Sequence, residues 1–166
     1  MYFTNIQQQT AFYQDPFCRA EYGKLTIIQG DRGCGKTMAC LNLASMISRG
    51  EPLPFSDSKE TSTGVVIYQT SEDGIADTMK PRLINANADC SNIRIINEEK
   101  CPLYFDDERI EQAIIQTKAR FMILDPLSAY IGEDVNLNQA VQVRNAFRKL
   151  YGVAQRNKCA IVILRL

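Results

Sequence analysis

Short apolar runs alternate with longer segments of helical periodicity along this chain. The apolar runs predict five strands, over 24–29, 65–68, 93–96, 121–124 and 160–164. The periodic segments predict helices over about 36–48, 75–86 and 137–157. A further helix is expected to begin near Asp106, as its N-cap, with Phe105 and Ile110 as a hydrophobic staple. Pro81 predicts a kink or a fresh start within the second helix.

This alternation of strands and helices predicts an α/β fold, in which helices cover both faces of a parallel sheet. The 166 residues suit one domain. Residues 1–22 read as a lead-in segment, because they are polar and aromatic without a clear period, and residues 23–166 as the core. The chain stops directly after a central-looking strand, so we expect this core to be incomplete at its C-terminus.

Composition narrows the class of protein only a little. The 19 basic and 19 acidic residues cancel, so the net charge favours neither a nucleic acid nor a membrane surface as partner. The first residues have no signal-peptide pattern, and no stretch is apolar enough for a membrane span. The six cysteines form no C-x-x-C pair, which is typical of free thiols in a reduced cytoplasm.

A glycine-rich turn follows the first strand and carries the strongest chemical signal. Its sequence, GDRGCGKT, fits G-x-x-x-x-G-K-[ST] at every fixed position, between a predicted strand and a predicted helix. Glycines let several backbone N–H groups face one concavity, and the helix adds its positive end. We expect ATP to contact the loop and the residue after it: Gly30, Asp31, Arg32, Gly33, Cys34, Gly35, Lys36, Thr37 and Met38.

Two further strands end in carboxylates that complement this loop. Asp125 closes the apolar run FMILD, and with the Thr37 hydroxyl it is a candidate for holding Mg²⁺. Glu72 follows the strand VVIYQT and is a candidate base for activating water, while Lys36 neutralises phosphate charge. Caps and acidic residues also favour the start of a helix, so the alternative stays open that Ser71, Glu72 and Asp73 simply begin the next helix.

These segments together resemble a known family. GDRGCGKT, VVIYQTSEDG, FMILDPLSAYIG and CAIVILRL are similar to the RecA-type P-loop ATPases, and most similar to the RepA-like (AAA_25) group of hexameric helicases and phage or mobile-element ATPases. The resemblance covers about Tyr22 to the end of the chain. It implies the strand order third, second, fourth, fifth, first, with Glu72 catalytic and Asp125 organising Mg²⁺. It also implies that Arg82 stacks on the adenine.

The resemblance implies a motor core that acts in DNA replication, recombination or repair. Single-stranded DNA is then a candidate partner, and a homo-hexamer is expected for the full-length protein. Two alternatives stay open: a nucleotide-binding switch with little turnover, and a small-molecule or nucleotide kinase. The last predicted helix carries several basic residues, which suit either a nucleic-acid surface or an ordinary solvated face.

Overall fold

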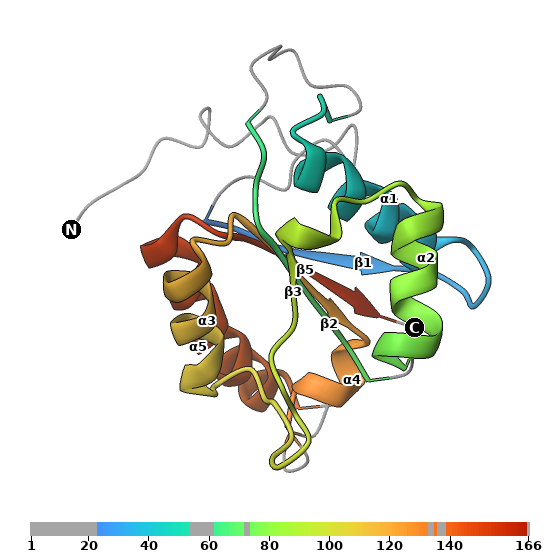
Figure 1. Ribbon diagram of the computed structural model, residues 1–166. Coiled ribbons are helices and arrows are strands. Elements are labelled where there is room, and N and C mark those ends of the chain that lie inside the picture. Colours follow the sequence, from blue (N-terminus) through green and yellow to red (C-terminus); the bar gives the residue numbers. More distant parts are fainter. Residues whose placement is uncertain (1–22, 54–61, 72–73, 133–134, 136–138, 166) are drawn as a thin grey trace, which may run out of the picture.

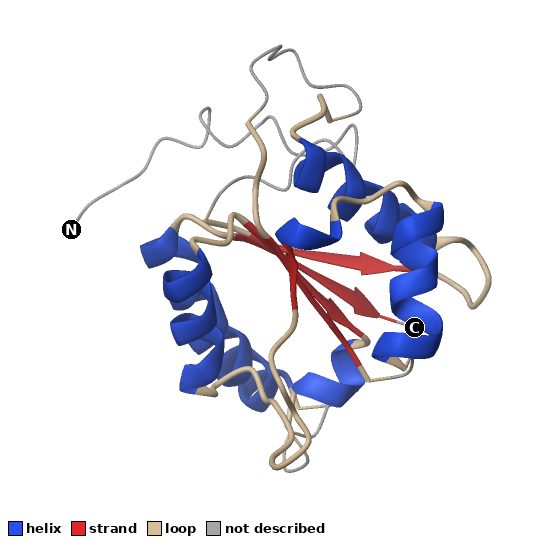
Figure 2. Cartoon of the chain, in the orientation of Figure 1, coloured by secondary structure: helices blue, strands red, loops and turns tan. Residues whose placement is uncertain are grey.

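Five parallel strands form one sheet, and helices cover both of its faces (Figures 1 and 2). The computed structural model describes residues 23–53, 62–71, 74–132, 135 and 139–165. The strands are β1 (Leu25–Gln29), β2 (Val66–Thr70), β3 (Ile93–Arg94), β4 (Phe121–Asp125) and β5 (Ala160–Arg165). The helical elements are α1 (Lys36–Arg49), the π-helical turn η2 (Ile75–Met79), α2 (Lys80–Asn85), the 3-10 turn η3 (Cys90–Asn92), α3 (Glu108–Thr117), α4 (Leu127–Tyr130) and α5 (Ala140–Asn157).

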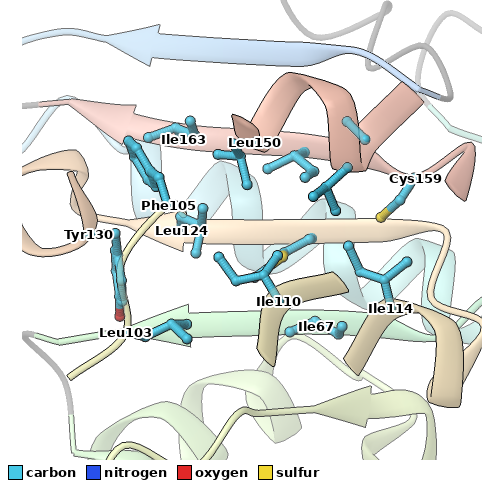
Figure 3. Packing of buried hydrophobic residues seen from close by; sticks show 14 of the residues in the cluster. Ile67, Leu103, Phe105, Ile110, Ile114, Leu124, Tyr130, Leu150, Cys159 and Ile163 are labelled. Atoms are coloured by element: carbon cyan, nitrogen blue, oxygen red, sulfur yellow. The ribbon is translucent and has the colours of Figure 1, made fainter. Parts of the chain in front are cut away.

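The sheet has the order β1-β5-β4-β2-β3, which is the implied order read from the opposite edge. The interior strands β4 and β5 are almost wholly buried, as expected for parallel strands covered on both faces. In β4, Phe121 and Ile123 pack on the side of α1, whereas Met122 and Leu124 pack on the side of α5. Figure 3 shows the second of these layers, in which Leu150 of α5 lies over the sheet.

The outer part of the sheet departs from the sequence-based expectation. The third strand was expected to reach Ile96 but ends at Arg94. The buried side chain of Gln69, on β2, takes over both backbone groups of Ile96: its Oε1 accepts from the Ile96 N–H (2.7 Å) and its Nε2 donates to the Ile96 carbonyl (3.0 Å). A side chain therefore replaces the next backbone pairing between the two strands.

Two helical segments also differ from expectation. The helix expected over 75–86 is split into a π-helical turn and α2, with Pro81 in the first turn of α2. That position suits proline, because the first N–H groups of a helix have no intrahelical acceptor. The segment after Asp125 was expected to be a loop but forms the short helix α4.

The N-cap of α3 is Asp107 and not Asp106, so that prediction was wrong by one residue. The Asp107 carboxylate accepts a hydrogen bond from the backbone N–H of Arg109 (2.8 Å), and Asp106 instead pairs with Lys149 of α5 (3.2 Å). Phe105 and Ile110 consequently do not occupy staple positions, although both are buried in the same cluster. The hydrogen bonds from the Arg109 guanidinium are the main cause that lowers the pKa of Asp107.

We predict that Asp107→Ala lowers the free energy of unfolding by about 1 kcal/mol at pH 7, the typical cost of a lost cap. The folded-state pKa of Asp107 is lowered, so its stabilisation is present above the unfolded pKa of about 3.9 and is lost as the pH falls through the folded-state value. The difference from the unsubstituted protein should therefore shrink below about pH 4. Urea unfolding at neutral and acid pH measures it.

Asp106→Ala is the matched control, because its carboxylate makes only an exposed ion pair with Lys149. It should change the free energy of unfolding by less than about 0.5 kcal/mol. A larger loss in Asp106→Ala than in Asp107→Ala would contradict the assignment of the cap.

Candidate functional site

The turn between β1 and α1 has a backbone that requires glycine at two positions. Gly33 and Gly35 have φ angles of 80° and 91°, in the left-handed region that strains other residues. A Cβ atom on Gly30 would lie 3.0 Å from the Cys34 sulfur, so the start of the loop is also held close. Gly35 has no side chain to cap α1, whose first N–H groups have no intrahelical acceptors. The loop and helix together therefore form a site that favours an anion.

Lys36 folds back over this loop. Its side-chain Nζ donates hydrogen bonds to the carbonyl oxygens of Gly30 and Asp31, each at 2.7 Å, and lies 3.7 Å from the Cys34 sulfur. The residue is only 8% exposed, so the ammonium group is largely removed from water. Both acceptors are neutral carbonyl oxygens, whereas a phosphate oxygen carries negative charge and would add charge–charge attraction to the hydrogen bond. A phosphate entering the loop is thus a stronger partner for Lys36 than its present acceptors.

Thr37 and Asp125 are hydrogen-bonded to each other at the carboxyl edge of the sheet. The Thr37 hydroxyl donates to Oδ2 of Asp125 at 3.0 Å, although the two residues lie 88 positions apart in sequence. Asp125 is 8% exposed at the carboxyl end of β4. A hydroxyl and a carboxylate are the hard oxygen ligands that Mg²⁺ accepts, together with water and substrate phosphates. This pair of residues therefore fits the magnesium role assigned to it from the sequence.

The thiol of Cys40, one helical turn after Thr37 on α1, is buried close to Asp125. Burial raises the pKa of the Cys40 thiol to about 12, and the negative charge of Asp125 adds a smaller upward contribution. Cys40 consequently stays a neutral, protonated thiol beneath the site and is no candidate ligand for a hard cation. The carboxylate of Asp125 is directed instead to the hydroxyl of Thr37.

The predicted catalytic Glu72 lies outside the described residues, as does Asp73. The strand that leads to it is described: Thr70 is paired with Asp125, and the Ser71 N–H donates to the Asp125 carbonyl at 3.2 Å. Ser71, the last described residue before position 72, therefore lies beside the candidate magnesium residue. The role of Glu72 stays a prediction.

The remaining predicted contact residues are solvent-accessible. Asp31 and Arg32 are exposed at the tip of the loop, and Met38 is 52% exposed in the first turn of α1. Arg82 lies exposed on α2, the helix that packs beside α1. Its stacking on an adenine ring stays a prediction, as do the nucleotide contacts of the loop residues.

Gln69 and Glu98 were missed by the sequence-based reasoning. Glu98 accepts hydrogen bonds from the Gln69 amide and from the Leu103 N–H (3.2 Å), which ties the segment after β3 to the end of β2. Burial, and then the charge of Glu98, raises the pKa of Tyr130. A cavity of about 400 Å³ opens beside Gln69 and Ser71 at this edge. The available signal was the amide of Gln69 within the predicted strand VVIYQT.

Comparison with protein families finds a match between residues 20–165 and the model of an AAA domain family, AAA_25. No curated protein matches the sequence. No helix among the described residues is both long and apolar enough to cross a membrane. The matched range contains the glycine-rich turn of residues 30–37, here called the phosphate loop, and all five strands. The parallel arrangement of these strands is that of a RecA-like P-loop NTPase. The chain therefore belongs to the AAA domain family AAA_25, a family of RecA-like, nucleotide-binding P-loop ATPases.

Proposed function

We propose that this chain is the ATP-hydrolysing core of a DNA-linked motor, of the RepA-like helicase kind or a related ATPase of replication, recombination or repair. The observation that carries the hydrolytic part is the hydrogen bond from Thr37 to Asp125, which brings the phosphate loop and the end of β4 together. The DNA-linked part rests on the resemblance of the sequence motifs to that group. A hexamer of the full-length protein belongs to the same proposal.

Each residue has a distinct role in this proposal. The loop N–H groups and Lys36 bind and orient the phosphates of ATP, while Thr37 and Asp125 hold Mg²⁺. The bound metal supplies neutralisation of charge on the phosphate oxygens. Glu72 accepts a proton from the attacking water. Lys36 is already poised over the loop, so binding exchanges its neutral acceptors for charged ones.

The first experiment measures binding and turnover of magnesium-ATP, with and without single-stranded DNA. We expect Lys36→Ala to lose binding, because it removes the only side-chain cation described within hydrogen-bonding distance of the loop carbonyls. Glu72→Gln should bind ATP normally but lose turnover by about 10²-fold or more, since only the proton acceptor is removed. Stimulation of turnover by DNA would support the motor.

The alternatives predict different outcomes of the same experiment. Tight binding with no turnover in the unsubstituted chain would favour a nucleotide-binding switch. Phosphate transferred to an added acceptor would favour a kinase, for which the cavity beside Gln69 and Ser71 is the natural acceptor site. Turnover that is equal in Glu72→Gln and the unsubstituted chain would remove Glu72 from the catalytic role.

We predict that Asp125→Asn raises the concentration of Mg²⁺ needed for half-maximal ATP turnover by about 10- to 100-fold, the usual loss when a residue supporting a metal is changed. The amide oxygen still accepts from Thr37, so the fold should be kept. Asp106→Asn, an exposed aspartate on the far side of the sheet, is the control. An unchanged magnesium requirement in Asp125→Asn would contradict the metal assignment.

We also predict that alkylation of Cys34 blocks ATP binding. The thiol is exposed, and its sulfur lies against Gly30 and near the Lys36 ammonium group, so an added group would fill the concavity. Cys90 and Cys101 are exposed as well, which makes Cys34→Ser the necessary control. That variant should keep ATP affinity after the same treatment. Normal affinity in unsubstituted protein with confirmed modification of Cys34 would contradict this prediction.

A further inference from the structure

The basic residues of this chain are unevenly distributed along the sequence. Residues 135–166 contain six Lys or Arg and no Asp or Glu, so residues 1–134 carry 13 basic residues against 19 acidic ones. Five of the six lie on α5 or directly after it: Arg144, Arg148, Lys149, Arg156 and Lys158. A chain with zero net charge therefore has one strongly basic element, on the face of the sheet opposite α1 (Figure 1).

One flank of α5 faces α3, and its charges are neutralised there. Lys149 pairs with Asp106 (3.2 Å), and Arg156 pairs with Glu111 (2.9 Å). Asn157 also donates to Glu111 at 2.9 Å. These contacts account for two of the five basic residues as ordinary links between neighbouring helices.

The other flank carries an unbroken exposed row that recurs every three or four residues, which places its members on one side of the helix. We call this row the α5 stripe; it consists of Val141, Arg144, Arg148, Tyr151, Gln155 and Lys158, all exposed. No ion pair connects Arg144, Arg148 or Lys158 to an acidic group within the described residues. At 1.5 Å per residue the stripe is about 25 Å long.

The stripe differs from the solvated helix face that the sequence also suggested. Solvated faces usually mix charges of both signs, whereas this one has a single sign. It also exposes a valine at 70% and a tyrosine at 38%. The Tyr151 hydroxyl accepts from the Gln155 amide (3.4 Å), which places the ring between Arg148 and Lys158 along the stripe. Cations that alternate with an exposed aromatic ring are the usual elements of a single-strand binding surface.

We propose that the α5 stripe binds single-stranded DNA, with Arg144, Arg148 and Lys158 on the phosphates and Tyr151 stacked on a base. That this surface binds a polyanion is inferred from the charge, exposure and spacing of its residues. That the polyanion is DNA rests on the proposed function. Arginine suits phosphate because its planar fork donates two parallel hydrogen bonds. The stripe lies on the opposite face of the sheet from α1, so it is separate from the nucleotide site.

Fluorescence anisotropy of an end-labelled oligothymidylate, titrated at several salt concentrations, tests the proposal on the full chain. The logarithm of the binding constant falls linearly with the logarithm of the salt concentration, and each phosphate contact to a single strand contributes about 0.7 to the steepness of that slope. Arg144→Ala/Arg148→Ala should therefore reduce the steepness by about 1.4. Tyr151→Ala should weaken binding about fivefold or more with an unchanged salt slope, because stacking releases no counterions. Tyr151→Phe should bind like the unsubstituted chain.

Lys80→Ala/Lys100→Ala is the matched control, since it removes two exposed lysines that lie outside α5 and changes the net charge equally. It should leave both the affinity and the salt slope unchanged. An unaltered slope in the double arginine variant, no binding by the unsubstituted chain, or equal binding of a polyglutamate peptide that is insensitive to Tyr151→Ala would each overturn the proposal.

The same variants separate this proposal from the proposed function. Arg144→Ala/Arg148→Ala should bind magnesium-ATP normally, and Lys36→Ala should bind the oligonucleotide normally. Loss of ATP binding in the unsubstituted chain would reject the ATPase while the DNA result stood by itself. Unchanged DNA binding in Arg144→Ala/Arg148→Ala, together with ATP turnover that DNA stimulates in the unsubstituted chain, would reject only the α5 stripe.

Discussion

The geometry of the site depends on one hydrogen bond, from the Thr37 hydroxyl to the Asp125 carboxylate. In the sheet β5 lies between β1 and β4, so this bond reaches over the end of a strand. It joins the first turn of α1 to the carboxyl end of β4, and both partners are held by regular elements rather than by loops. Parallel strands bring their carboxyl ends to one edge, where ligands of open α/β sheets bind. Sheet direction and a single polar contact therefore define the site.

Polar side chains also decide where the regular structure stops at this edge. Gln69 takes the hydrogen bonds that would have extended β3, and Glu98 holds the amide of Gln69 and the backbone of Leu103. These bonds satisfy buried polar groups that would otherwise cost stability. They also anchor the last described residues before position 72. The edge of the sheet beside the candidate site is thus fixed by side chains and not by strand pairing.

Much of this fold could be predicted from residue patterns, and the failures have identifiable causes. The strands were found because buried parallel strands are continuous apolar runs, and the phosphate loop because its glycines and Lys36 have a fixed spacing. The shortened β3 was missed because the side chain that ends it, Gln69, is distant in sequence. The cap of α3 was misplaced because Asp106 and Asp107 are chemically equivalent until the position of Lys149 is known. Likewise, periodicity along α5 could not distinguish paired from unpaired basic residues, since the partner acids lie on α3.

The contacts on the α5 face suggest how the two proposed surfaces are physically connected. The segment after Asp125 forms α4, and the carbonyl of Tyr130 at its end accepts from the Phe105 N–H at 2.7 Å. The Phe105 ring then packs against Phe147 of α5, with 5.2 Å between the ring centroids. Figure 3 shows Phe105 and Tyr130 in the same buried cluster as Leu150. A continuous chain of contacts is not by itself allosteric coupling. Coupling requires an element with two arrangements, and each ligand must shift the equilibrium between them. The short helix α4 lies between the two surfaces, since it begins two residues after Asp125 and reaches α5 through Phe105, whose N–H donates to Tyr130 and whose ring packs on Phe147.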